Sequence, residues 1–226
     1  MRPAPDQEHL MTRVRLDLCI SADGYVAGPD QRPDEPLGVG GIRLHQWKLD
    51  TGFSGDNLRP AAGAEEPSVD AQVVAELFDG VGAYVMGRKM FGGGPGPWPT
   101  DEPWNGWWGE DPPYHAPVFV ITHHPRETLE LEGGNVFHFV TEGPQRALEL
   151  AREAAGGQDV MVSGGADVAN QLLAAGAIEE IQLHVAAAIL GGGERLFEGV
   201  PADALPLSLD RVLQGADVTH LRYRVG

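Results

Sequence analysis

Three short polar stretches of the sequence combine glycines, cations and hydroxyl groups in a way that suits bound phosphate. Each follows an apolar run: "GRK" at 87–89, "THHPR" at 122–126 and "SGGA" at 163–166. Glycine permits close approach of the backbone to a ligand, and the free N–H groups at the start of a helix attract anions. The candidate binding residues are Gly87, Arg88, Lys89, Thr122, His123, Arg126, Ser163, Gly164, Gly165 and Ala166.

Each stretch by itself has a simpler interpretation. A strand followed by two glycines and a helix is as often a tight turn as an anion site. The adjacent cations Arg88 and Lys89 are more often part of a solvated face, and His123 is more often an ordinary loop residue. The combination favours a phosphate site, because all three stretches follow predicted strands and would lie on one rim of a sheet.

Alternation of strands and helices predicts the sheet that would position these residues. Apolar patterns indicate strands at 14–20, 83–87, 117–125, 135–140, 159–162 and 179–190, and a terminal hairpin at 207–225. Helical patterns cover 68–80, 144–156 and 166–176. This order predicts an α/β fold with a mixed, mainly parallel sheet flanked by helices and an antiparallel C-terminal edge. Ligands then bind beyond the carboxyl ends of the strands, in loops 21–28, 87–94, 122–126, 163–167 and 190–194.

The remaining segments are interpreted as a tail and two insertions. Residues 1–12 form a loose N-terminal tail, and residues 13–226 form one domain. Segments at about 29–67 and 92–116 are rich in glycine and proline and have too few apolar residues for cores of their own. They are therefore predicted to be loop insertions in that domain.

All five tryptophans lie in these two insertions. Trp47 is in the first, and Trp98, Trp104, Trp107 and Trp108 are in the second. They either cover the core as an aromatic plug or form the wall of a pocket for a flat ligand. In the second interpretation Trp47, Trp98 and Trp107 are candidate substrate-binding residues.

Composition narrows the classes of partner. The formal net charge of −17 argues against nucleic acid and anionic membranes. The single cysteine excludes an internal disulfide and fits a reducing compartment, so a cytoplasmic location is expected. Neither HExxH nor CxxC spacing occurs, so no metal site is predicted, and the G-x-S-x-G motif of a nucleophilic serine is absent.

Five motifs occur in an order that resembles the dihydrofolate-reductase-like superfamily. They are "ISADGYVAG" (20–28), "VMGRKMF" (85–91), "VFVITHHP" (118–125), "VMVSGGADVANQLL" (160–173) and "LHVAAAILGGGERLFEG" (183–199). In particular, the chain resembles the branch that contains the C-terminal reductase domain of bacterial riboflavin biosynthesis proteins (RibD).

The resemblance implies an NADPH-binding fold, often dimeric in this branch. It places Gly87, Arg88, Lys89 and the 163–166 turn at the cofactor diphosphate. It places Thr122, His123 and Arg126 at the 2′-phosphate. Asp23 and Gly24 would begin a flexible loop that closes over nicotinamide and substrate.

The sequence therefore predicts an NADPH-dependent reductase that transfers hydride to a small, flat heterocycle, pterin-like or similar to a riboflavin precursor. Asp23 is the candidate proton donor, a role that requires a raised pKa. The alternative is a non-catalytic nucleotide- or ligand-binding protein. This alternative arises because Asp70, Glu76 and Asp79 do not align with the pterin-binding acid of dihydrofolate reductases. The apolar segment 185–190 is a candidate homodimer contact.

Overall fold

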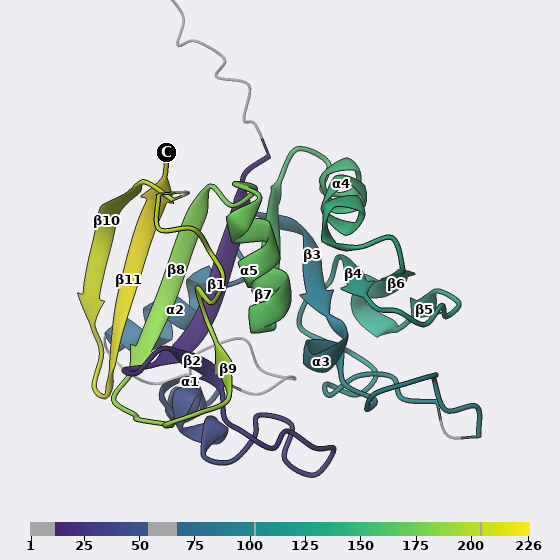
Figure 1. Ribbon diagram of the computed structural model, residues 1–226, viewed down its shortest axis with the longest axis horizontal. Coiled ribbons are helices and arrows are strands. Elements are labelled where there is room, and N and C mark those ends of the chain that lie inside the picture. Colours follow the sequence, from purple (N-terminus) through teal and green to yellow (C-terminus); the bar gives the residue numbers. More distant parts are fainter. Residues whose placement is uncertain (1–11, 54–66, 102, 204) are drawn as a thin grey trace, which may run out of the picture.

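The computed structural model describes residues 12–53, 67–101, 103–203 and 205–226. Almost all of the predicted tail, and residues 54–66 of the first predicted insertion, lie outside these ranges. The described residues form a nine-stranded sheet in the order β10-β11-β8-β1-β7-β3-β4-β6-β5 (Figure 1). Its strands are β1 (Val14–Ser21), β3 (Val81–Gly87), β4 (Pro117–Ile121), β5 (Leu129–Glu130), β6 (Val136–Val140), β7 (Asp159–Gly164), β8 (Glu180–Ala186), β10 (Leu207–Gln214) and β11 (Val218–Val225).

The sheet is mixed and mainly parallel, as predicted. Strands β8, β1, β7, β3, β4 and β6 run parallel to one another. Strand β11 pairs antiparallel with both β8 and β10, so the C-terminal hairpin forms the antiparallel edge. The expected strand at 179–190 ends at Ala186, and the expected strand at 117–125 ends at Ile121.

Helices cover both faces of the sheet. On one face lie α4 (Pro144–Ala154) and α5 (Ala166–Ala174), in front of the sheet in Figure 1. The other face carries α1 (Gln46–Asp50) and α2 (Val69–Glu76). The alternation of strand β1 explains this arrangement: Leu16 and Leu18 point into the core beneath α4 and α5, while Cys19 packs with Trp47 and Val73 on the opposite face.

The predicted insertions contribute short elements. The first contains the 3₁₀ helix η1 (Gly41–Leu44) and α1, and the second follows α3 (Arg88–Phe91). Another 3₁₀ turn, η2, spans Glu132–Gly134. The predicted ligand loops 21–28 and 190–194 are more regular than expected, because β2 (Tyr25–Ala27) pairs with β9 (Glu194–Arg195) in a separate two-stranded sheet. Within the described ranges no helix has the length and apolar character needed to cross a membrane.

Candidate active site

The glycine turn after β7 presents the start of α5 without a side-chain cap. Gly164 has φ +101°, which favours glycine, and a Cβ there would lie 2.9 Å from Leu18 Cδ2. Gly165 is the N-cap of α5, and as a glycine it has no side chain to accept a hydrogen bond from the first turn. A Cβ on Gly165 would meet no atom within 4 Å. The turn is therefore open to an approaching anion, which the helix dipole would stabilise.

Gly87, at the end of β3, lies against this turn. A Cβ at Gly87 would be 3.0 Å from Val168 Cγ2 and 3.7 Å from the backbone nitrogen of Gly165. The close packing explains why glycine is suited to this position. The tertiary structure thus brings together two of the three predicted stretches, 87–89 and 163–166.

Arg88 makes contacts that the sequence did not predict. Its Nε donates to the Gly92 carbonyl (3.0 Å), its Nη2 donates to the Gly93 carbonyl (3.1 Å), and the guanidinium carbon lies 3.0 Å above the ring centre of Trp98. Burial and the nearby charge of Arg126 lower the pKa of Arg88 to about 10. Its Nη1 is buried and has no partner among the described residues, so that nitrogen can still serve an anion.

The other two predicted cations also have protein partners. Arg126 donates to the Trp104 carbonyl through Nη1 and to Asn105 Oδ1 through Nη2 (2.8 Å). Lys89 Nζ lies 2.5 Å from Glu194 Oε1, at an exposed position. Irregular backbone leaves carbonyl groups without ladder partners, and the two arginines supply donors to the 92–116 segment. These cations thus have protein partners, and their expected contacts with cofactor phosphates stay a prediction.

Thr122 and His123 differ in exposure. Thr122 is buried, and its hydroxyl accepts a hydrogen bond from the His124 N–H (3.2 Å), closing a local turn. His123 is exposed at the end of β4. Trp98 connects this turn to Arg88, because its Nε1 donates to the His124 carbonyl (2.8 Å).

A cavity of about 390 Å³ extends from the glycine turn over the face of the sheet that carries α1 and α2. Ser163, Gly165 and Ala166 lie at its border, so the turn and the cavity form one continuous site. The lining is largely apolar and aromatic and includes Phe53, Leu77, Phe78, Met90, Trp107, Trp108, Tyr114 and Met161. Such a lining suits a flat ligand and keeps water out.

The tryptophans have different roles. Trp107 lines the cavity, as expected of a substrate wall, together with Trp108. Trp98 is outside the cavity lining and packs against Arg88 and Phe139. Trp47 is buried in the core, with its ring centre 4.8 Å from those of both His184 and His220. The expected substrate contact of Trp47 is corrected, because its ring is buried in the core, whereas that of Trp98 stays a prediction.

Asp23 has the opposite electrostatic environment to that of a proton donor. Hydrogen bonds with Ser21 and from the backbone N–H groups of Gly191 (2.7 Å) and Leu190 (3.1 Å) lower the pKa of Asp23 to about 2. The ionised carboxylate fixes the 190–191 turn, and neither Asp23 nor Gly24 lines the cavity. Gly24 instead accepts a hydrogen bond from the Leu196 N–H (3.1 Å), which ties its loop to β9. The assignment of Asp23 as proton donor is corrected on these grounds.

Sequence reasoning missed several polar residues of the cavity, among them Asp17, His45, Lys48 and Tyr84. Burial and the charge of Lys48 lower the pKa of His45 to about 3. Burial raises the pKa of Tyr84, whose hydroxyl has no hydrogen-bond partner among the described residues. The carboxylate of Asp17 inside an apolar strand was the one signal that the sequence offered.

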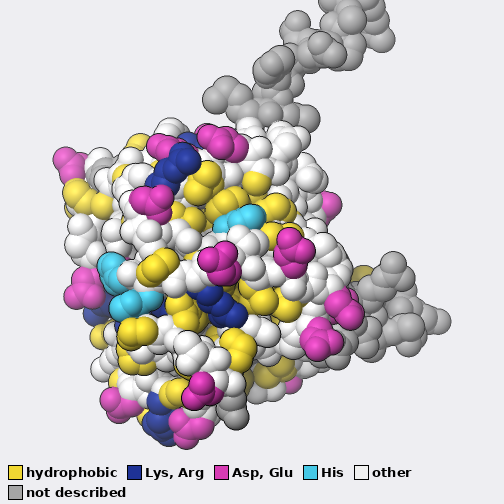
Figure 2. All heavy atoms as spheres, turned by 90° about the vertical axis from the view of Figure 1, so that its right-hand side faces the viewer, with side chains coloured by type: hydrophobic (Ala, Val, Ile, Leu, Met, Phe, Trp, Pro, Cys, Tyr) yellow, Lys and Arg dark blue, Asp and Glu magenta, His cyan; other side chains and the backbone are white. Residues whose placement is uncertain are grey.

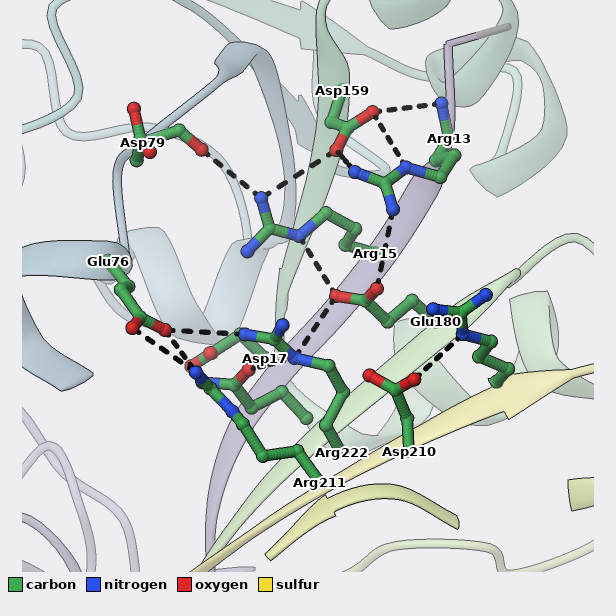
Figure 3. Close-up of polar contacts among 12 residues, drawn as sticks. Arg13, Arg15, Asp17, Glu76, Asp79, Asp159, Glu180, Asp210, Arg211 and Arg222 are labelled. Atoms are coloured by element: carbon green, nitrogen blue, oxygen red, sulfur yellow. Dashed lines mark hydrogen bonds and ion pairs between the residues drawn. The ribbon is translucent and has the colours of Figure 1, made fainter. Parts of the chain in front are cut away.

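No group of three or more metal-ligating side chains occurs in the part of the chain that the structure describes. Neighbouring charges belong to an ion-pair network on the same face of the sheet, where Arg15 reaches Glu180 and Asp159 (Figure 3). Arg15 lies on β1 two residues before Asp17, on the same face of the sheet. The network therefore borders the polar end of the cavity.

Comparison with known proteins identifies relatives of this fold. The family model described as RibD C-terminal domain matches residues 12–221. Among solved structures, a pyrimidine reductase-like protein from Corynebacterium diphtheriae is 13% identical, with a TM-score of 0.54, 95% of this chain covered and 92% of that one. Dihydrofolate reductase from Enterococcus faecalis, complexed with NADP(H), is 13% identical, with a TM-score of 0.50 and coverage of 95% and 96%.

A diaminohydroxyphosphoribosylaminopyrimidine deaminase/5-amino-6-(5-phosphoribosylamino)uracil reductase from Thermotoga maritima is 14% identical, with a TM-score of 0.53. The match covers 96% of this chain and 57% of that longer one. The comparison with curated proteins returned no significant match. At these identities the solved structures establish the fold.

Proposed function

The chain belongs to the RibD C-terminal domain family, and on that premise we propose that it is an NADPH-dependent reductase of a small, flat heterocycle. The observation that carries the proposal is the continuity of the site: the open glycine turn and the aromatic cavity share Ser163, Gly165 and Ala166. A dinucleotide with its diphosphate at the turn could extend its flat nicotinamide ring into the cavity.

The residues at the turn fit the diphosphate of such a cofactor. The backbone at Gly165 is open, its glycine N-cap gives α5 no side-chain cap, and Arg88 keeps a buried nitrogen with no hydrogen-bond partner among the described residues. When bound, reduced nicotinamide supplies the hydride. The protein orients the two reactants and excludes water, through Trp107, Trp108 and the apolar lining.

Names of the relatives support the substrate class. The dihydrofolate reductase structure contains NADP(H), and the Thermotoga protein is named as a uracil reductase as well as a deaminase. Both names point to flat, nitrogen-containing rings, pterin-like or similar to a riboflavin precursor. A ring of this kind matches the cavity, because its faces can stack on tryptophan and its polar edge can reach Asp17 and Tyr84.

Binding of NADPH to a Gly165→Val variant tests the site. A side chain at Gly165 adds carbon atoms where the structure leaves space open, whereas Gly164→Val would strain a residue at φ +101° and disturb Leu18. We expect calorimetry to show NADPH binding by the parent protein and at least about a hundredfold weaker binding by Gly165→Val, because the branched side chain keeps the diphosphate from approaching the backbone donors.

The matched control is Ala175→Val, which adds a branched side chain at the exposed C-cap of the same helix. Thermal unfolding of both variants separates lost binding from lost folding. Absence of NADPH and NADH binding by the parent protein, or unchanged binding by Gly165→Val, would contradict the proposal. Binding without oxidation of NADPH by any pterin, flavin precursor or quinone would instead support a non-catalytic binding protein.

A further inference from the structure

The floor of the cavity carries two hydrogen-bonding groups on one face of the sheet. Asp17 on β1 has 9% of its side chain accessible, and Tyr84 on β3 has a buried hydroxyl with no hydrogen-bond partner among the described residues. Strand β7 lies between them, and its Met161 is in register with Tyr84. Because adjacent strands are about 4.8 Å apart, β1 and β3 are separated by about 10 Å, a span that a fused ring system can bridge.

Asp17 is held in place from the side of the core. Its two carboxylate oxygens each lie 3.2 Å from His184 Nε2. A row of hydrogen bonds continues from His184 Nδ1 to His220 Nδ1 (2.7 Å) and from His220 Nε2 to Asp70 Oδ1 (3.0 Å). A carboxylate has about four acceptor positions, so the contact with one imidazole leaves acceptor capacity toward the cavity. The floor can thus accept a hydrogen from a ring N–H at Asp17 and donate one to a ring carbonyl from Tyr84.

The mouth of the cavity is apolar although it faces solvent. Ile42 on η1, Leu49 on α1 and Trp107 in the second insertion line the cavity, yet they are 53%, 44% and 36% exposed. Exposed apolar side chains that border a pocket are typical of a surface that a ligand covers. The cavity therefore suits a flat molecule with one hydrogen-bonding edge and an apolar or uncharged opposite end.

Among the described residues that line the cavity, the positive charges already have partners. Lys89 Nζ lies 2.5 Å from Glu194 Oε1, and Lys48 Nζ lies 5.3 Å from the ring centre of Trp47, within the range of a cation–π contact. His45 carries no charge at neutral pH, because burial and the charge of Lys48 lower its pKa to about 3. A phosphate in the cavity would therefore have to displace a partner of one of these two lysines.

We propose that the substrate of this protein is a flat ring without a phosphate group, with its hydrogen-bonding edge at Asp17 and Tyr84 and an apolar or uncharged end at the mouth. This inference rests on the proposed reductase function and names the substrate class of the same site. A phosphate monoester carries about −1.5 to −2 charges at neutral pH, and burying it without a free cation is costly. The Thermotoga protein, by contrast, is named as a reductase of a phosphoribosyl compound.

Binding of pterins to the unliganded protein tests this class. The compounds 6-methylpterin, neopterin and neopterin 3′-phosphate are fluorescent, share one ring and differ only at the end opposite its hydrogen-bonding edge. In fluorescence titrations we expect 6-methylpterin and neopterin to bind, and the phosphate to bind at least about tenfold more weakly than neopterin. Equal or tighter binding of the phosphate, or no binding of 6-methylpterin, would overturn the proposal. No cofactor is needed, so the result stands whether or not the protein binds NADPH, and the two proposals fail separately.

Tyr84→Phe tests the polar floor. The substitution removes a hydroxyl without a partner among the described residues, so no hydrogen bond of the described fold is lost. We expect binding of 6-methylpterin to weaken about three- to tenfold, the usual value of one hydrogen bond. Tyr223→Phe removes a hydroxyl outside the cavity lining, so this matched control should leave binding unchanged. Equal effects of the two variants would overturn the assignment of the floor.

Leu49→Arg tests the mouth. It adds a cation at an exposed position of the lining, so neopterin 3′-phosphate should bind at least about tenfold more tightly than it does to the parent, with little change for neopterin. Ile189→Arg adds the same charge at an exposed residue outside the lining and should have no such effect. An unchanged preference for neopterin in Leu49→Arg, or an equal gain in Ile189→Arg, would overturn the conclusion that the mouth sets the substrate class.

Discussion

At the scale of single residues, hydrogen-bond partners decide what a charged side chain can do. Asp17 lies in the middle of β1 and Asp23 just beyond its carboxyl end; Asp23 is held by two backbone N–H groups in a turn, whereas Asp17 faces the cavity. The same holds for the cations, since Arg88 and Arg126 both donate to carbonyl groups of the 92–116 segment. Residue type alone shows neither the contrast between the two aspartates nor the structural role of the two arginines.

Arg126 provides a prediction at this scale. If it also contacts the 2′-phosphate of NADPH, Arg126→Ala should weaken NADPH binding about 10- to 100-fold, the usual loss for a hydrogen bond to a charged group. NADH has no 2′-phosphate, and its binding should change much less. Calorimetry with both nucleotides measures the difference, with Arg146→Ala on the exposed face of α4 as the control. Equal losses for the two nucleotides would refute the 2′-phosphate assignment.

At the scale of elements, ion pairs and a helix cap hold α2 against the sheet. Arg211 and Arg222, on the terminal hairpin, both reach Glu76 near the end of α2 (Figure 3). Arg222 also lies 3.7 Å from Glu180 on β8. The network thereby joins α2 to the strands that carry His184 and His220. This placement brings Asp70 within hydrogen-bond distance of His220.

The cap at the other end of α2 gives the prediction for this scale. Ser68 Oγ accepts a hydrogen bond from the Ala71 N–H (3.1 Å). Ser68→Ala should lower the free energy of unfolding by about 1 kcal/mol, as for other lost N-caps. Ser68→Thr retains a hydroxyl and should stay closer to the parent. Denaturant unfolding measures both variants, and equal stability of all three proteins would show that the cap contributes nothing.

At the scale of the whole molecule, charge and the edges of the sheet govern association. Acidic side chains are spread over the face in Figure 2, in keeping with the formal net charge of −17, and basic side chains form isolated groups. The segment 185–190 begins in β8, which is paired on both sides. Its first two residues, 185 and 186, therefore cannot pair with a strand of a second chain. Strand β10 is an outer strand of the sheet, with Leu207, Leu209 and Val212 exposed.

The homodimer stays a prediction. If it forms, we expect β10 to make the contact between the two chains. The outer side of an edge strand has unpaired N–H and C=O groups. When such a strand also exposes apolar side chains, it favours pairing with another chain. Analytical ultracentrifugation should show a dimer for the parent protein and a monomer for Leu209→Lys, because the added charge would be buried in the contact. Ile189→Lys changes an equally exposed residue outside β10 and should leave the dimer intact. If Ile189→Lys dissociates the dimer and Leu209→Lys does not, the dimer contact lies at the 185–190 segment and the assignment to β10 is wrong.

The sequence by itself determined the sheet and the position of the glycine turn. Apolar periodicity and glycine placement are local, so the strands, the main helices and the 163–166 turn could be predicted from the order of residues. Only the tertiary structure decided which polar side chains meet. The hydrogen-bonded pairs among Asp17, Asp70, His184 and His220 are up to 167 residues apart in the sequence, and no periodic pattern links them. The parallel register of β1 with β8, and the packing of α2 on the hairpin, bring them into one row because burial forces each polar group to find a partner.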